Sequence, residues 1–177
     1  MSTMLLRVLG SVEGAADNQF SQPRGICCSA LTQEVYVVDA GNHRIQVFDL
    51  RSLAFIRSIG EKPAHSAAQA QHNNERALGN PVSCALDDDG YLYVSDMTNH
   101  RIMVYDRYTG EAVRVISRQG SLAGFVNKPY GIAIDSTEGH LYVCDYHNHR
   151  VQVFDKDSGV FIRSIGQYGT AAGSAAG

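Results

Sequence analysis

Three stretches of the chain repeat one pattern: EVYVVDAGNHRIQVFD at 34–49, YLYVSDMTNHRIMVYD at 91–106 and HLYVCDYHNHRVQVFD at 140–155. They align on their central histidine without a gap. The alignment extends upstream to a proline that precedes a short apolar run, and downstream to a segment of the type FIRSIG, found at 55–60 and 161–166. Such self-similarity indicates an architecture built from one recurring supersecondary unit.

Each repeat contains four short apolar segments, rich in Val, Ile, Tyr and Phe. Short segments of this composition favour β-strands over helices. Asp, Ser and Gly are frequent between the first and second segments and between the third and fourth, where they suit tight hairpin turns. The sequence therefore predicts four-stranded antiparallel sheets.

The second strand of each repeat is apolar on both faces, as in Val35–Val38. A sheet with one face in water would alternate, so both faces should pack against neighbouring sheets. Radially arranged four-stranded blades do this, and we expect an all-β fold, a β-propeller. Three blades are predicted, at 23–60, 81–117 and 129–166, with an orphan outer strand at 5–10 and a flexible tail at 167–177.

Three blades are fewer than closed propellers have, since those usually contain about four to eight. The sequence therefore predicts a partial or open propeller. Its two end blades would expose apolar sheet faces. We expect another subunit, or the rest of a longer propeller, to cover them.

The repeats resemble NHL repeats. The resemblance rests on Pro-x-Gly-Ile before the second strand, Tyr-Val-x-Asp within it, and Asn-His-Arg-(Ile/Val)-Gln-Val-Phe-Asp after it, and it covers nearly all of 5–166. It implies a propeller, commonly six-bladed, that serves as a binding platform. One departure is Ser117, which stands where the other repeats have Gly60 and Gly166, and it concerns the local turn of the second repeat.

Length and charge limit the possible functions. The 177 residues, of which 44% are hydrophobic, suffice for one domain with a substantial core. A formal net charge of −3 gives no excess of positive charge to attract a phosphate backbone. No apolar stretch approaches the length of a membrane span, and the first ten residues do not read as a secretory signal. We expect a soluble, cytoplasmic protein with no membrane contact.

The repeated histidines, His43, His100 and His149, would bind a metal only if their nitrogens converged to about 2 Å from one ion. Equivalent positions on successive blades instead fan out around an axis. The sequence therefore predicts no metal site, no cofactor and no catalytic residue here.

An aspartate precedes each Asn-His-Arg triplet by a few residues. A carboxylate that accepts hydrogen bonds from the turn N–H groups or from the arginine would lock the turn between the second and third strands. Asparagine is expected to take any left-handed backbone that the turn needs. The predicted structural locks are Asp39 with Arg44, Asp96 with Arg101, and Asp145 with Arg150.

The four cysteines replace small or apolar strand residues. Cys84 aligns with Ile26 and Ile132, and Cys27 aligns with Ala85 and Ala133. Since the chain has no Cys-x-x-Cys pair, we expect buried thiols rather than disulfides or a zinc site. The acidic stretch at 86–90 is interpreted as a hairpin turn rather than a calcium loop.

In such a blade, the turn between the second and third strands and the loops that join the repeats emerge at the same end. The loop at 61–80 is the longest, and its Ala- and Gln-rich part predicts a short helix over 66–76. The predicted binding residues lie on this face: Asn42, His43, Asn99, His100, His147, Asn148, His149, His65, His72 and Arg76.

The favoured function is a non-catalytic scaffold that binds a protein or peptide through this face. Two alternatives stay open, because some NHL propellers bind single-stranded RNA on a basic face and others form the substrate-recognition part of a ubiquitin ligase. An enzyme is disfavoured. The enzymes of peptide amidation that have NHL-like propellers are secreted, disulfide-bonded and metal-dependent, whereas this sequence indicates neither secretion nor disulfides.

Overall fold

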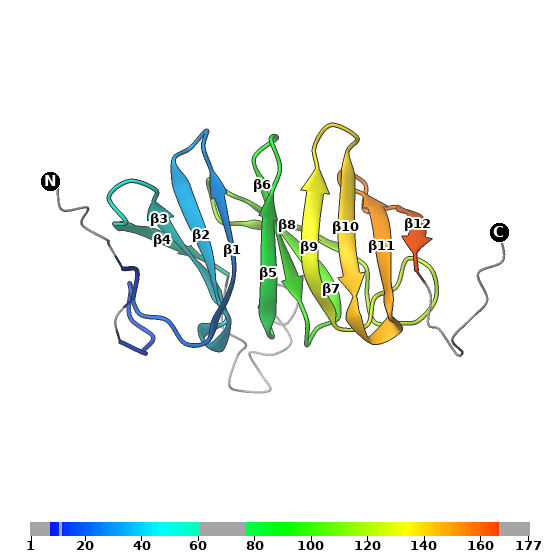
Figure 1. Cartoon of the computed structure of the whole chain (residues 1–177), viewed down its shortest axis with the longest axis horizontal. Coiled ribbons are helices and arrows are strands. Elements are labelled where there is room, and N and C mark those ends of the chain that lie inside the picture. Colours follow the sequence, from blue (N-terminus) through cyan, green and yellow to red (C-terminus); the bar gives the residue numbers. More distant parts are fainter. Residues whose placement is uncertain (1–7, 11, 61–76, 167–177) are drawn as a thin grey trace, which may run out of the picture.

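Three four-stranded antiparallel sheets make up the computed structural model, which describes residues 8–10, 12–60 and 77–166. Within each sheet the strands follow one another in chain order. Figure 1 shows the sheets standing side by side as three blades, with their first strands adjacent to one another. The predicted all-β propeller fold is thereby confirmed, with three blades in the described part of the chain.

The strands fall where the four apolar segments of each repeat lie. Blade 1 contains β1 (Pro23–Ser29), β2 (Glu34–Asp39), β3 (Arg44–Asp49) and β4 (Phe55–Ile59). Blade 2 contains β5 (Pro81–Leu86), β6 (Tyr91–Asp96), β7 (Arg101–Asp106) and β8 (Ala112–Ile116). Blade 3 contains β9 (Pro129–Asp135), β10 (His140–Asp145), β11 (Arg150–Asp155) and β12 (Phe161–Ile165).

The hydrophobic core lies between the blades rather than inside any one of them. One cluster joins Tyr36 and Ile45 of blade 1 to Leu92 and Met103 of blade 2. A second cluster joins blade 2 to blade 3 in the same way. The middle sheet is therefore packed on both faces, which explains why its second strand is apolar at consecutive positions.

Loops that precede the blades complete these interfaces. Leu78 and Val126, which lie just before β5 and β9, are fully buried in the first and second interblade clusters. Phe20, which lies just before β1, packs on Phe48 of blade 1. A parallel bridge joins the two ends of each loop, Glu13 with Phe20 in the first and Gln119 with Val126 in the other. Each of these loops thus places a hydrophobic side chain at the edge of the blade that follows it, and we call it the wedge loop of that blade.

Ser117 keeps the turn that glycine forms in the other repeats. Its φ of 67° lies in the left-handed region, as do those of Gly60 and Gly166. The Ser117 hydroxyl donates to the Gly124 carbonyl at 2.8 Å, which ties the turn to the wedge loop that follows. This departure from the repeat pattern therefore leaves the local backbone unchanged.

Three predicted segments lie wholly or partly outside the described residues. The helix expected over 66–76 lies there entirely, as do 5–7 of the expected orphan strand and the tail at 167–177. Residues 8–10, the described part of that orphan segment, are not in a strand. The described residues form three full blades of four strands each, and they do not form the predicted orphan strand.

Replacing Leu92 by alanine tests the interblade core. Leu92 is fully buried between blades 1 and 2, so Leu92→Ala should lower the free energy of unfolding by about 2–5 kcal/mol. Leu31→Ala, at an exposed turn position, should change it by less than about 0.5 kcal/mol. Urea unfolding of both variants measures the difference, and equal losses would show that the core is placed wrongly.

Candidate functional site

A fully buried carboxylate, Asp39, organises the turn between β2 and β3. It accepts hydrogen bonds from the Ser21 backbone N–H at 2.7 Å, from the Asn42 side-chain amide at 3.0 Å, and from Arg44 Nε at 2.8 Å. The arginine also donates through Nη2 to two carbonyls of the wedge loop. One carboxylate thus joins the turn to the loop that precedes the blade.

The other two blades repeat this arrangement. Asp145 accepts from the Asn127 N–H at 2.6 Å and from Arg150 Nε at 2.8 Å. Asp96 accepts from Asn99 at 2.7 Å and from Arg101 Nε at 3.3 Å. Both carboxylates are fully buried.

Two buried glutamines belong to these networks, and the sequence interpretation did not assign them a role. The Gln46 amide donates to Asp39 at 2.9 Å and to the Gln19 carbonyl at 2.6 Å. Gln152 makes the same pair of contacts in blade 3. The signal was present, since a glutamine recurs in an otherwise apolar third strand. In blade 2 the position is held by Met103, which is buried in the apolar core instead.

The left-handed residue of each turn is the histidine, and the expectation of an asparagine there was wrong. His43, His100 and His149 have φ values of 56°, 53° and 54°. The asparagine before each of them uses its side-chain amide to donate to the buried carboxylate, as Asn42 and Asn148 show. Because that contact holds the asparagine within the short turn, the change of backbone direction falls on the next residue.

Two of the histidines connect neighbouring blades. His43 Nδ1 lies 3.1 Å from the Leu78 carbonyl, and the Lys128 N–H donates to His100 Nδ1 at 3.1 Å. Burial, together with the charge of Lys128, lowers the pKa of His100 and favours the neutral ring that this acceptor role requires. Each ring therefore contacts the loop that precedes the next blade.

The predicted binding residues differ in their exposure to solvent. Asn42 is buried and Asn148 half-buried, and these two asparagines, like the exposed Asn99, donate to the aspartates of their turns. Those that the structure exposes are Asn99, His147 and His149, while His43 and His100 are half-buried. The remaining three, His65, His72 and Arg76, lie outside the described residues.

An exposed aromatic cluster lies at the end of blade 3 that carries the turn between β10 and β11. Tyr130 and Tyr146 are 45% and 59% exposed, and their ring centroids lie 5.7 Å apart. The His147 ring lies 5.3 Å from that of Tyr146. Sequence analysis missed the tyrosines, although each replaces a different residue type in the other two repeats: Arg24 and Val82 for Tyr130, and Ala40 and Met97 for Tyr146.

A shallow pocket adjoins this cluster at the start of the three first strands. It is lined by Arg24, Gly25, Val82, Ser83, Tyr130 and Gly131. We use the name turn face for the surface formed by 40–43, 97–100 and 146–149 together with this pocket. It contains the exposed members of the predicted binding set.

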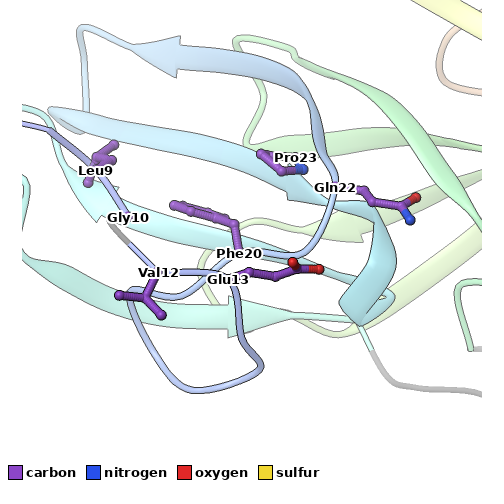
Figure 2. Close-up of a pocket in the computed structure, with 7 residues that line it drawn as sticks. All are labelled: Leu9, Gly10, Val12, Glu13, Phe20, Gln22 and Pro23. Atoms are coloured by element: carbon purple, nitrogen blue, oxygen red, sulfur yellow. The ribbon is translucent and has the colours of Figure 1, made fainter.

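A second pocket lies on the outer side of blade 1. Figure 2 shows the residues that line it: Leu9, Gly10, Val12, Glu13, Phe20, Gln22 and Pro23. Leu9 and Phe20 pack there against Val35, Val37 and Phe48 of the sheet. This apolar surface faces away from blade 2.

At the opposite end of the blades, Lys156 lies among three carboxylates. Its Nζ is 2.5 Å from Asp89, 2.8 Å from Asp157 and 3.5 Å from Asp87. Burial alone would lower the pKa of Lys156, but hydrogen bonds to Asp157 and Asp89 and the charge of Asp87 raise it above its ordinary value. The ammonium group thus supplies the positive charge for this cluster, and Asp87 also accepts from the Tyr91 N–H within its hairpin turn.

Comparison with known proteins agrees with the repeat geometry. The family model described as NHL repeat matches residues 20–48 and 126–154. In blades 1 and 3 these ranges contain the buried or half-buried wedge-loop residue (Phe20 or Val126), the first two strands and the aspartate-centred turn. The chain carries NHL repeats. The resemblance noted from the sequence alone is therefore confirmed.

Relatives share this NHL region but are much longer. NHL repeat-containing protein 2 of Gallus gallus is 31% identical over 108 residues, which is 59% of this chain and 14% of that protein. Protein brain tumor of Drosophila melanogaster is 26% identical over 123 residues, which is 70% of this chain and 10% of that protein. The chain spans a small part of the length of the curated relatives it matches.

A solved structure of Kuenenia stuttgartiensis hydrazine synthase superposes on 90% of this NHL chain with a TM-score of 0.64 and 18% identity, and 41% of that chain is covered. At this identity the likeness shows the propeller fold. Among the described residues, no helix is long and apolar enough to cross a membrane.

Removing the carboxylate of Asp39 should destabilise the protein strongly. Asp39→Ala leaves the Ser21 N–H and the side chains of Asn42, Arg44 and Gln46 without their shared acceptor, so we expect a loss of about 2–4 kcal/mol. Asp17→Ala, which removes an exposed carboxylate 3.8 Å from the same arginine, should cost less than about 0.5 kcal/mol. Thermal and urea unfolding check both values. Similar effects of the two substitutions would contradict a locking role for Asp39.

Proposed function

We propose that this NHL chain is a non-catalytic scaffold that binds a protein or peptide through the turn face, in the cytoplasm. The observation that carries the proposal is the exposed pair Tyr130 and Tyr146 beside a pocket lined by all three first strands. Tyrosine is enriched at the energetic centres of protein interfaces, since it buries a large area and loses few rotamers on binding.

The turn networks support this role by making the surface rigid. Tyr146 belongs to the short 3₁₀ segment η2 (Tyr146–Asn148), which lies between Asp145 and the left-handed His149. The buried carboxylate of Asp145 holds both the turn and the wedge loop. A partner would therefore meet a preorganised surface, which lowers the entropic cost of binding.

Single-stranded RNA is the main alternative ligand, because the same tyrosines would stack on bases. The charge pattern favours a protein. Arg44, Arg101 and Arg150 are each ion-paired with a buried aspartate, so their charges are compensated on this face. Arg24 is exposed beside the pocket, but the chain carries a net charge of −3. Recognition of substrates for a ubiquitin ligase would be one use of the proposed protein-binding surface.

Substitution of both tyrosines tests the proposed surface. Affinity capture with the whole chain should recover a partner that Tyr130→Ala/Tyr146→Ala loses by at least tenfold, with titration of the purified partner as confirmation. Tyr108→Ala is the matched control, because this exposed tyrosine follows β7 at the opposite end of blade 2. Equal loss for the control, or no loss for the double variant, would contradict binding at the turn face.

An oligonucleotide titration separates RNA from protein. If a labelled single-stranded RNA bound the turn face, the logarithm of its affinity would fall linearly with the logarithm of salt concentration, and the tyrosine variant would bind more weakly. We expect no such binding at physiological salt. Tight, salt-dependent and tyrosine-dependent binding would replace the protein-scaffold proposal with the RNA proposal.

We also propose that the outer faces of blades 1 and 3 receive a further blade, from another subunit or from the rest of a longer propeller. Ile165 of blade 3 is 47% exposed, whereas its equivalents Ile59 and Ile116 are 1% and 2% exposed at the two interblade interfaces. The apolar pocket of Figure 2 lies on the opposite outer face, on blade 1. The two end faces thus correspond to the two halves of the interface that the chain forms twice internally.

Light scattering after size-exclusion chromatography distinguishes the two sources of that blade. If another subunit covers the faces, the chain should associate at micromolar concentration, and Ile165→Glu should weaken association at least tenfold. Ile162→Glu is the control, because Ile162 is exposed like its equivalents Ile56 and Val113. Equal effects of the two substitutions would contradict association through this face. A well-folded monomer at all concentrations that binds no apolar dye would show that three blades suffice and would overturn the proposal.

A further inference from the structure

Two cysteines meet across the interface between blades 1 and 2. Cys27 lies on β1 and Cys84 on β5, and their sulfur atoms are 3.3 Å apart. Cys84 is buried within the interblade cluster, while Cys27 is half-buried and packs against it. Both thiols are free in the structure. The two side chains thus point toward one another from neighbouring sheets.

The next interface shows that packing does not require sulfur at this place. Cys27 pairs with Tyr36 as Ala85 pairs with Tyr93. Cys84 pairs with Val94 as Ile132 pairs with Val143. The facing pair between blades 2 and 3 is therefore Ala85 and Ile132. Only one of the two described interfaces places a cysteine at both facing positions.

We propose that Cys27 and Cys84 are an oxidisable pair that forms a disulfide between blades 1 and 2 in the presence of a low-molecular-weight disulfide such as oxidised glutathione. A disulfide has a sulfur–sulfur distance of about 2.05 Å. The two sulfurs must therefore approach each other by about 1.3 Å, given their present separation of 3.3 Å. Small rotations of the two side chains, with a slight shift between the strands, would cover this distance.

The reaction takes place in two exchange steps. The Cys27 thiol loses its proton and the thiolate attacks one sulfur of the small disulfide, which forms a mixed disulfide on Cys27 and releases one small thiolate. The Cys84 thiol then loses its proton and attacks Cys27 Sγ, which forms the Cys27–Cys84 bond and releases the second small thiolate. The two released thiolates take up the two protons. The protein dithiol is oxidised by two electrons and the small disulfide is reduced to two thiols.

The order of the steps follows from the surroundings of each sulfur. The hydrogen bond with Cys27 and burial both raise the pKa of the Cys84 thiol, so it stays protonated and shielded from a solvent-borne oxidant. Cys27 is half-buried and therefore more accessible to solvent than the buried Cys84. It therefore attacks first, and contact between the two sulfurs makes the second, intramolecular step fast despite the weakly acidic Cys84 thiol.

The bond would fix the two blades to one another. It closes a loop from residue 27 to residue 84, which contains β2, β3 and β4 of blade 1 and the long segment between the blades. A loop of this length restricts the unfolded chain considerably, so oxidation should raise the melting temperature by about 5–10 °C.

The sequence-based expectation of buried thiols is wrong for Cys28 and Cys144, which are exposed. The test uses the whole chain with Cys28→Ser and Cys144→Ser, because these two thiols would otherwise react on their own. After treatment with oxidised glutathione and quenching with N-ethylmaleimide, intact mass should show the loss of two hydrogens and no alkylated thiol. Peptide mapping should find Cys27 joined to Cys84. Melting should shift upward and return after reduction.

Single variants check the proposed order. With Cys84→Ser, or Cys84→Ala if serine disturbs the core, the reaction should stop at a stable mixed disulfide on Cys27. With Cys27→Ser, Cys84 should stay unmodified in the folded protein. Two free thiols at full excess of oxidised glutathione, a lasting mixed disulfide in the unsubstituted pair, or faster reaction at Cys84 would each overturn the proposal. No binding partner enters this test, so its outcome is separate from that of the scaffold proposal.

Discussion

Three carboxylates with no exposure to solvent, Asp39, Asp96 and Asp145, impose the constraint on which the turn face depends. A buried charge is tolerated only when it is paired and its lone pairs accept hydrogen bonds. Each aspartate meets this requirement with donors from its own turn and from the loop that precedes the blade. Turn, strand pair and wedge loop are therefore fixed together. The polar networks hold one end of the blades in a single arrangement, while apolar packing holds the blades to one another.

Interactions between residues close together in the sequence could be predicted, whereas those between distant residues could not. Strand positions and the aspartate–arginine spacing are local, because Asp39 and Arg44 pair across a short turn. Contacts such as Gln46 with the Gln19 carbonyl or Cys27 with Cys84 join residues far apart along the chain, and only the register between sheets brings them together. The repeat pattern predicts the strands of each blade, but it carries little information on which side chains contact one another between blades.

The backbone of the turn illustrates the same limit at short range. Asparagine tolerates the left-handed region better than most residues, so intrinsic preference favoured it over the histidine. The buried carboxylate changes the outcome, because the Asn42 and Asn148 amides must donate to it. His43 and His149 then adopt the positive φ. Hydrogen-bond demand within a short turn thus outweighs a conformational preference of the individual residue.

Positions that differ between the repeats are where a particular activity can reside, since those that recur maintain the blade. Asp39 and its equivalents recur and lie buried, whereas Tyr130 and Tyr146 appear once and are exposed. The Cys27–Cys84 contact likewise has Ala85 and Ile132 as its counterpart in the next interface. A propeller blade needs apolar volume at these sites, and many side chains supply it. The specific choice of aromatic rings on one face and of two thiols between two blades therefore adds chemistry that the fold itself does not demand.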